Sequence, residues 1–495
     1  MEVLTHWVGG APTDWAADRL GDVYDPATGE LAMRVAYATS ADVDRSVGLA
    51  AQAWPAWRDT SLGRRADVLF RFRSLLAESK AELAALITAQ HGKVLADAVG
   101  EIERGLEVVD LACGLPSALR GSYSEQVSGS IDVHSVRQPL GVVAVISPFN
   151  FPVMVPLWFT PIAIAAGNAV VLKPSERDPA PANFLAGLWS KAGLPAGIFN
   201  VLHGDAQTVN ALLDHPTVAA VSFVGSTPVA RHVYETAAAA GKRVQALGGA
   251  KNHMLVLPDA DLDLAADAAV SAAYGSAGER CMAISVVVAV NPVGDELIRR
   301  IRKRIADIKV GDGRRQVDMG PLITRSHRER VASYIDAGLA GGAELLVDGR
   351  NAAVDGAADG FWLGPTLFDR VTPEMPLYQD EIFGPVLAVV RADSFDDGLQ
   401  LINANPYGNG TSLFTSDGGA ARRFQREVEV GLVGINVPIP VPVAYYSFGG
   451  WKQSLFGDTH AYGPEGFHFY TRNKVVTSRW PDRTDSGVKL SMPVT

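Results

Sequence analysis

The chain has 495 residues, of which 47% are apolar and 20% charged, and its net charge is −10. This length predicts two or three domains with a sizeable core. The acidic balance disfavours a nucleic-acid partner or an anionic membrane surface, because either needs a basic face. Two cysteines exclude a disulfide framework, and their spacing does not predict a metal site. With neither a signal sequence nor an apolar run long enough to cross a bilayer, we expect a cytoplasmic protein.

Residues 1–40 contain turn signals between short apolar stretches and predict an irregular lead-in with strands. Apolar side chains then recur at helical spacing and predict four helices, the last over about 94–115. Cys113 lies on this fourth helix among apolar neighbours, where a thiol is expected to act as a small buried hydrophobe. Residues 121–140 alternate polar and apolar positions and predict a β-hairpin that packs on another subunit.

From residue 141 onward, apolar strands alternate with helices, which is typical of doubly wound α/β domains. The first series has strands expected at 141–147, 169–173, 199–202, 218–224 and 243–247. A second series has strands expected near 254–257, 285–290, 386–391, 411–414 and 432–436. We place the boundary between the series near Gly248. The tail, 467–480, returns to strand-like alternation and is expected to pair with the hairpin as a small β unit.

The loop Gly275-Ser276-Ala277-Gly278-Glu279-Arg280-Cys281 is the first candidate for chemistry. It precedes an apolar run, 282–290, that predicts a buried strand. A thiol held on a loop before such a strand is placed to act as a nucleophile. Taken alone, however, a single cysteine is more often a buried hydrophobe.

Two polar motifs follow strands of the first series. Ser147-Pro148-Phe149-Asn150-Phe151-Pro152 offers the Asn150 amide as a donor for an oxyanion, although Asn150 also suits a turn between prolines. Lys173-Pro174-Ser175-Glu176 suits a ribose, and Glu176 would repel a 2′-phosphate, which favours NAD over NADP. The plain alternative is a solvated ion pair. In open α/β sheets, ligands bind at this edge.

Two further motifs suit a dinucleotide. Phe223-Val224-Gly225-Ser226-Thr227 combines a strand end, a glycine turn and a helix start, which suits a pyrophosphate, although the G-x-G-x-x-G pattern is absent. Glu381-Ile382-Phe383-Gly384-Pro385-Val386 precedes a strand. Glu381 is expected to point into the cleft and hold a second ribose, unless it is a surface residue before a turn.

Together, the motifs P-F-N-F-P, K-P-S-E, F-V-G-S-T, G-x-R-C and E-I-F-G-P resemble the aldehyde dehydrogenase superfamily, in order and spacing, over essentially the whole chain. The resemblance implies that Cys281 is the nucleophile, and that Asn150 and the Cys281 backbone N–H form the oxyanion hole. It implies NAD as cofactor, with no metal. The implied NAD-binding residues are Ser147, Phe149, Lys173, Glu176, Gly225, Ser226, Glu381 and Phe383.

The same resemblance implies the aldehyde dehydrogenase fold, an α/β fold with two doubly wound domains and a small β oligomerisation unit. In this division, 1–120 and 141–247 form the NAD-binding domain, 248–466 the catalytic domain, and 121–140 with 467–495 the oligomerisation unit and tail. The family likeness suggests a homotetramer or homodimer assembled through that unit.

One departure from the family pattern bears on the reaction. The usual E-L-G-G motif supplies a glutamate that activates water, but this chain has Ala246-Leu247-Gly248-Gly249. Alanine cannot act as a general base, so hydrolysis of a thioacyl-enzyme should be slow. A thiol, with a pKa of about 8.5, needs less help than water to become a nucleophile. The sequence therefore favours release of the acyl group to coenzyme A.

Four stretches, 249–253, 278–283, 438–444 and 456–463, are similar to the methylmalonate-semialdehyde dehydrogenase subfamily. That likeness implies a substrate with a carboxylate beside the aldehyde. Arg280, next to the thiol, is a natural counter-charge for it. Arg104 matches a second arginine of the subfamily, although on the residues alone it is equally a solvated helix residue, and Phe149 is expected to border the substrate.

The hypothesis is an NAD-dependent oxidative decarboxylation of methylmalonate or malonate semialdehyde, which gives propionyl-CoA or acetyl-CoA through a thioacyl group on Cys281. A hydrolytic dehydrogenase that yields a free acid is the first alternative, with Glu381 or Glu279 as the base. A non-catalytic NAD-binding protein of the same fold is the second. The joint presence of Cys281, Asn150, Lys173 and Glu381 argues against it.

Overall fold

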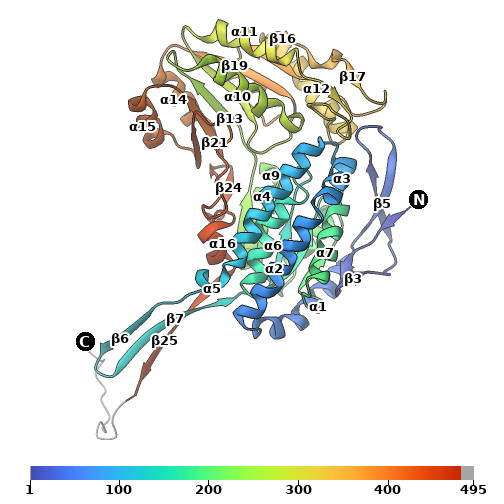
Figure 1. Ribbon diagram of the computed structural model, residues 1–495, viewed down its shortest axis with the longest axis vertical. Coiled ribbons are helices and arrows are strands. Elements are labelled where there is room, and N and C mark those ends of the chain that lie inside the picture. Colours follow the sequence, from blue (N-terminus) through green and yellow to red (C-terminus); the bar gives the residue numbers. More distant parts are fainter. Residues whose placement is uncertain (1, 481–495) are drawn as a thin grey trace.

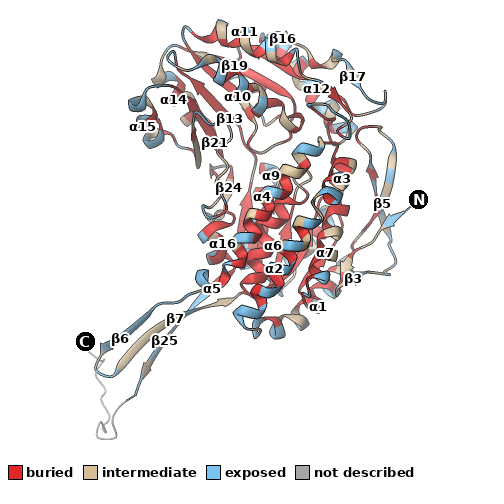
Figure 2. Cartoon of the chain, in the orientation of Figure 1, coloured by how far each residue is buried: buried red, intermediate tan, exposed pale blue. Residues whose placement is uncertain are grey.

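The computed structural model describes residues 2–480. Two α/β units lie one above the other in the view of Figure 1, and a long β arm extends from the lower unit. Figure 2 shows that the buried residues concentrate in the two units, whereas the arm is exposed over much of its length. The α/β character and the doubly wound units that the strand pattern predicts are confirmed.

The first unit is built on an eight-stranded sheet whose central strands, β12, β11, β8, β9 and β10, run parallel. These strands are almost continuously apolar because helices cover both faces of the sheet. The sheet order is β24 (Leu455–Phe456), β12 (Arg243–Leu247), β11 (Val218–Val224), β8 (Val142–Ile146), β9 (Ala169–Lys173), β10 (Phe199–Val201), β2 (Trp7–Val8) and β3 (Ala11–Pro12).

The helices of this unit place apolar side chains in one continuous core with the sheet. They are α1 (Ser40–Arg58), α2 (Leu62–Glu78), α3 (Lys80–His91), α4 (Leu95–Cys113), α5 (Leu115–Ala118), α6 (Met154–Ala165), α7 (Ala180–Lys191), α8 (Ala206–Asp214) and α9 (Thr227–Ala239). None of the helices within residues 2–480 has both the length and the apolar character that crossing a membrane requires.

The second unit has a seven-stranded sheet, parallel except at its β16 edge. The order is β16 (Glu344–Val347), β18 (Thr366–Asp369), β19 (Val386–Ala392), β14 (Ile284–Val290), β13 (Asn252–Val256), β21 (Gly410–Phe414) and β22 (Leu432–Ile435). Its helices are α10 (Leu262–Tyr274), α11 (Gly294–Ile305), α12 (Arg325–Ala340), α13 (Pro376–Gln379), α14 (Phe395–Ala404) and α15 (Gly418–Glu427). The buried apolar side chains of these strands and helices form a second core.

The arm is a three-stranded antiparallel sheet of β6 (Tyr123–Ser128), β7 (Ile131–Pro139) and β25 (Thr471–Arg479). β25 pairs with β7 along its whole length, from Thr471 opposite Pro139 to Arg479 opposite Ile131. The predicted pairing of the tail with the hairpin is therefore confirmed. The part of the predicted tail beyond Trp480 lies outside the described residues.

The prediction of a strand-like tail from residue 467 is wrong at its start, because residues up to 469 belong to helix α16 (Gly463–Phe469). Its buried residues, such as Phe467, pack on the first core. The neighbouring β24 also returns to the first sheet, where it pairs antiparallel with β12. The predicted division of the chain into domains, with a boundary near Gly248, stays a prediction.

The remaining elements are short or peripheral. The lead-in contains the sheet β1 (Val3–Leu4), β5 (Leu31–Tyr37) and β4 (Arg19–Tyr24). Two-stranded ladders join β15 (Val310–Gly311) to β17 (Val354–Asp355) and β20 (Tyr407–Gly408) to β23 (Trp451–Lys452). Short 3-10 turns cover η1 (Gly275–Gly278) and η2 (Gly349–Asn351).

Candidate active site

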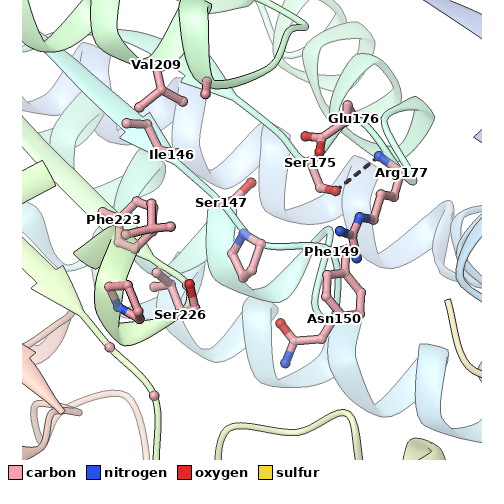
Figure 3. Close-up of a pocket in the computed structure, with 18 of the residues that line it drawn as sticks. Ile146, Ser147, Phe149, Asn150, Ser175, Glu176, Arg177, Val209, Phe223 and Ser226 are labelled. Carbon is pink, nitrogen blue, oxygen red and sulfur yellow. Dashed lines mark hydrogen bonds between the residues drawn. The ribbon is translucent and has the colours of Figure 1, made fainter. Parts of the chain in front are cut away.

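A cavity of about 840 Å³ opens at the carboxyl ends of the parallel strands of the first sheet (Figure 3). Such an edge is where ligands bind in open α/β sheets. Of the predicted site residues, those in its wall are Ser147, Phe149, Asn150, Lys173, Glu176, Gly225, Ser226, Cys281, Glu381 and Phe383. Both predicted catalytic residues and every predicted cofactor residue therefore line one cavity, although they come from distant parts of the sequence.

The loop before Cys281 has an unusual backbone. Ser276 and Ala277, within η1, have φ angles of +52° and +53°, and Gly278 follows at +73°. Residues other than glycine rarely adopt this left-handed backbone conformation. Backbone strain of this kind is concentrated at functional sites. The three residues turn the chain sharply between α10 and β14, which places Cys281 in the cavity wall.

Two buried asparagines that the sequence motifs did not reveal hold the backbone of Cys281. Asn252 Nδ2 and Asn409 Nδ2 donate to the Cys281 carbonyl oxygen at 2.9 and 3.1 Å. Asn252 begins β13, and Asn409 precedes β21, which pairs with β13. The nucleophile is thus anchored to neighbouring strands of the second sheet.

The surroundings of the Cys281 thiol favour its protonated form. Burial raises its pKa to about 12, and the nearby Glu381 carboxylate acts in the same direction, while Arg280 opposes them. A thiol must lose its proton to attack a carbonyl, so the site needs a change of environment or a proton acceptor before reaction.

Asn150 lies in the loop between β8 and α6, with 4% of its surface exposed. Its side-chain Nδ2 donates to the Glu279 carbonyl oxygen at 3.1 Å, two residues before the thiol. An amide nitrogen carries two hydrogens, so a second one is available to a ligand. This contact joins the candidate oxyanion donor to the loop of the candidate nucleophile.

Lys173 and Glu176 form a partly buried ion pair, with Nζ 3.1 Å from Oε2. Burial alone would raise the pKa of Glu176, but Lys173, a backbone hydrogen bond and Arg177 together hold it below its ordinary value. Glu176 is therefore a carboxylate that can accept hydrogen bonds from hydroxyls. Arg177, which the motifs did not single out, lies over the Phe149 ring at 5.3 Å and lines the same cavity.

The turn between β11 and α9 needs glycine at 225, because a Cβ there would stand 2.5 Å from the Phe223 ring. Ser226 is the N-cap residue of α9, and its side chain makes no capping hydrogen bond. A helix N-terminus with free backbone donors favours an anion such as a pyrophosphate. Here α9 begins at the cavity wall.

The Glu381 side chain reaches the cavity and packs directly against Gly249. A Cβ atom on residue 249 would lie 2.3 Å from Glu381 Oε2. Its Oε1 accepts a hydrogen bond from the Ala250 N–H at 2.9 Å. Burial raises the pKa of Glu381 to about 7, against the effects of that bond and of Lys251. Lys251 is itself buried and donates to the Leu377 and Asp380 carbonyls, which secures the segment before Glu381.

Ala246 lies on β12, fully buried between Phe223 on β11 and Phe456 on β24. Its methyl group is the whole side chain, so no carboxylate stands there. The acidic side chains in the cavity wall are those of Glu176, Asp205 and Glu381. Of these three, Glu381 is the one whose charge acts on the Cys281 thiol.

The two predicted substrate arginines do not line this cavity. Arg280 Nη2 is paired with Asp97 of α4 at 2.8 Å, and the Arg280 guanidinium packs against Gly275. Arg104 Nη1 contacts the Glu107 carboxylate, and its Nη2 donates to the Val441 and Pro442 carbonyls. Both guanidinium groups are thus already occupied.

Arg104 is nevertheless electrostatically close to the reaction centre. Burial raises the pKa of Tyr462 above its ordinary value, the charge of Arg104 lowers it, and a thiolate at Cys281 would raise it further. Tyr462 packs with Trp158 and Phe448 in an aromatic cluster, and Cys281 packs against the core that contains them.

Two further cavity residues escaped the motifs. His327 and Arg330, both on α12, line the wall beside Phe383. His327 Nε2 lies 2.8 Å from the Phe383 carbonyl oxygen, and burial lowers the pKa of His327 to about 4. Nothing in the spacing of α12 marks them, because only the fold brings that helix to the cavity. Among residues 2–480, no group of three or more His, Cys, Asp or Glu side chains is arranged to hold a metal ion.

Comparison with known proteins places this geometry in context. A family model described as "Aldehyde dehydrogenase family" matches residues 15–476. The chain is 54% identical to the malonate-semialdehyde dehydrogenase of Pseudomonas aeruginosa over 98% of this chain and 97% of that protein. It is 48% identical to the malonate-semialdehyde dehydrogenase of Halalkalibacterium halodurans, over 97% and 99%.

Solved structures agree closely in fold. A methylmalonate-semialdehyde dehydrogenase from Oceanimonas doudoroffii superimposes with a TM-score of 0.96 at 51% identity, over 97% of this chain and 99% of that one. A Sinorhizobium meliloti 1021 protein, named as a candidate methylmalonate-semialdehyde dehydrogenase and solved with NAD, superimposes with a TM-score of 0.97 at 48% identity, over 98% and 99%.

Proposed function

The chain belongs to the aldehyde dehydrogenase family, and we propose that it oxidises malonate or methylmalonate semialdehyde with NAD and transfers the acyl group to coenzyme A. The names of two similar proteins, one from Pseudomonas aeruginosa and one from Oceanimonas doudoroffii, support this substrate class. The NAD complex of the Sinorhizobium meliloti relative supports the cofactor.

The residues of the cavity fit NAD. Glu176 and Glu381 offer carboxylates for the two ribose rings, and the start of α9 at Ser226 offers backbone donors for the pyrophosphate. Bound NAD supplies the acceptor for the hydride of the aldehyde carbon. Phe149 and Phe383, whose rings meet edge to face at 5.9 Å, would shield the reacting end of the cleft from water.

In the proposed reaction, the Cys281 thiolate attacks the aldehyde carbon. The Asn150 amide and the Cys281 backbone N–H donate to the oxyanion that forms. Loss of hydride leaves a thioester on Cys281. The substrate carboxylate then leaves as a one-carbon product, and the carbon that carried it keeps the electron pair and takes up a proton. The sulfur of coenzyme A next attacks the thioester carbonyl, which breaks the bond to the Cys281 sulfur and gives acetyl-CoA or propionyl-CoA.

The observation that carries the coenzyme A step is Ala246. It occupies the position of the family's water-activating glutamate, and it is fully buried between Phe223 and Phe456 of the flanking strands. Water, with a pKa far above 7, needs a base there, whereas a thiol does not. The thioester on Cys281 is therefore expected to outlive attack by water and to react with coenzyme A.

For the substrate carboxylate we propose Arg104 and Arg280. The charge of Arg280 acts directly on the Cys281 thiol, whereas that of Arg104 acts on Tyr462. To bind substrate, each guanidinium must share or exchange its present carboxylate partner, Glu107 or Asp97. A bidentate guanidinium–carboxylate contact would give the specificity for an acidic aldehyde.

The decisive assay follows NADH formation from malonate semialdehyde with and without coenzyme A. We expect steady turnover with coenzyme A, and one equivalent of NADH per active site without it. Equal turnover in both, with free acid as product, would contradict the acyl-transfer step and favour a hydrolytic enzyme. The variant Ala246→Glu should gain turnover without coenzyme A, since it restores a base.

We further propose that the protein is cytoplasmic and assembles through its arm as a homotetramer or homodimer. Tyr123 of β6 and Val475 of β25 expose 63% and 61% of their surfaces, although both are apolar residues in a sheet. Apolar side chains that gather on one exposed sheet are typical of a surface that a protein partner covers. Gel filtration at the mass of a monomer would contradict this assembly.

A further inference from the structure

The end of α3 supports the loop that carries Asn150. The His91 ring stacks on Phe149, with centroids 6.0 Å apart and planes inclined by 24°. Lys93 Nζ donates to the Asn150 carbonyl oxygen at 2.6 Å and lies 4.5 Å from the centroid of Phe151. Two residues that follow one another closely in sequence thus contact three consecutive loop residues.

Lys93 extends this support through a buried ion pair. Its Nζ lies 2.7 Å from Glu101 Oε2, and the two residues expose only 1% and 2% of their surfaces. The other oxygen of Glu101, Oε1, accepts from the backbone N–H groups of Val153 and Met154 at 2.8 and 3.0 Å. The pair therefore ties the carbonyl of Asn150 to the start of α6 and closes the loop at both ends.

Stability does not explain this arrangement well. The cost of removing two charges from water generally offsets the attraction between them, and apolar replacements are often neutral. A buried charge is better accounted for by the geometry it imposes, and here that geometry is the position of Asn150.

We propose that Lys93, held by Glu101, is a positioning residue that sets the Asn150 amide in the oxyanion hole. The inference rests on the oxyanion role of Asn150 in the proposed function. Lys93 does not line the cavity and acts only through the loop. Displacing an oxyanion donor costs about 100- to 1000-fold in rate, so loss of its support should cost a measurable part of that.

The test is a double-mutant cycle on the burst of NADH from malonate semialdehyde at saturating NAD. Lys93→Met should slow the burst at least tenfold and leave the Kd of NAD within twofold. In the background of Asn150→Ala, the same change should alter the burst less than twofold, because the donor is already gone. A purely structural lysine would act independently of Asn150.

Lys242→Met is the matched control. Lys242 is also buried, and its Nζ donates to two backbone carbonyls, those of His215 and Val218, away from the cavity. It should lower the Tm as Lys93→Met does, but leave the burst within twofold. Glu101→Gln is a second probe that retains the shape and an acceptor oxygen, and it should slow the burst at least threefold.

The outcomes separate the two claims. If Asn150→Ala leaves the burst unchanged, the proposed oxyanion hole is wrong. If Asn150→Ala slows the burst while Lys93→Met and Glu101→Gln do not, only the positioning role is wrong. The positioning role would also be wrong if Lys93→Met slowed the NADH burst by the same factor in the wild-type and Asn150→Ala backgrounds.

Discussion

The two cysteines of the chain sit in regions that differ in backbone and not in acidity. Cys113 ends α4 in the core, where burial raises its pKa to about 11. Cys281 follows a left-handed turn, and burial raises its pKa to about 12. Neither thiol is ionised at neutral pH. What distinguishes the two sulfurs is therefore their surroundings. Cys281 lies in a cavity wall, near the Asn150 amide, and its carbonyl is held by two asparagines, whereas Cys113 packs among the apolar side chains of the first core.

Replacing each cysteine in turn should give the largest difference in kcat between the two regions. Cys281→Ser should lower kcat at least about 1000-fold, because it replaces the nucleophile with a far less acidic hydroxyl. Cys113→Ser should leave kcat within twofold. Steady-state NADH formation measures both, and comparable losses in the two variants would show that Cys113 also takes part in the reaction.

Alkylation should distinguish the two thiols next. Below its pKa, a thiol gains thiolate about tenfold per pH unit, so labelling of Cys281 by iodoacetamide should rise about 100-fold from pH 7 to pH 9. Cys113 exposes only 7% of its surface and should stay unlabelled in the folded protein. Peptide mass spectrometry measures both rates. Equal labelling of the two cysteines would show that access does not distinguish them.

The anchored carbonyl gives a smaller effect. Asn252→Leu removes one of the two donors to the Cys281 carbonyl and also the acceptor for the Gly410 N–H. We expect kcat to fall about tenfold with little change in the Kd of NAD, since the loop loses definition and the cofactor wall stays intact. An unchanged kcat with a lower Tm would mean that these bonds serve stability alone.

The smallest effect concerns stability at Cys113. Cys113→Ala deletes one buried sulfur from a packed helix and should lower the free energy of unfolding by about 1–2 kcal/mol. Denaturant titration measures the change. A loss of activity at unchanged stability would instead assign Cys113 a role in the reaction.

Much of the fold was predictable from the sequence, because its central strands are short apolar runs between turn signals. The predicted bounds of β9, β11 and β12 match those in the structure. Helix α16 was missed, since Gly463, Pro464 and Gly466 are poor helix formers and packing on the first core overrides them.

The residues of the candidate site also fall into those that the sequence predicted and those that it did not. Motifs at strand ends identified Cys281, Asn150 and Glu381, because the chemistry there demands particular residue types. Asn409 and Lys93 were missed, since each acts on a residue far away in the sequence: 128 positions separate Asn409 from Cys281, and 57 separate Lys93 from Asn150. Only the assembled sheets and helices bring such partners together.

The fate of the acyl group on Cys281 tests the central claim most directly. Mass spectrometry of the enzyme after one turnover of malonate semialdehyde with NAD should show an acetyl group on the Cys281 peptide and none on the Cys113 peptide. That adduct should persist without coenzyme A and disappear, with release of acetyl-CoA, when coenzyme A is added. An adduct on another residue, or one that water removes as fast as coenzyme A does, would contradict the account.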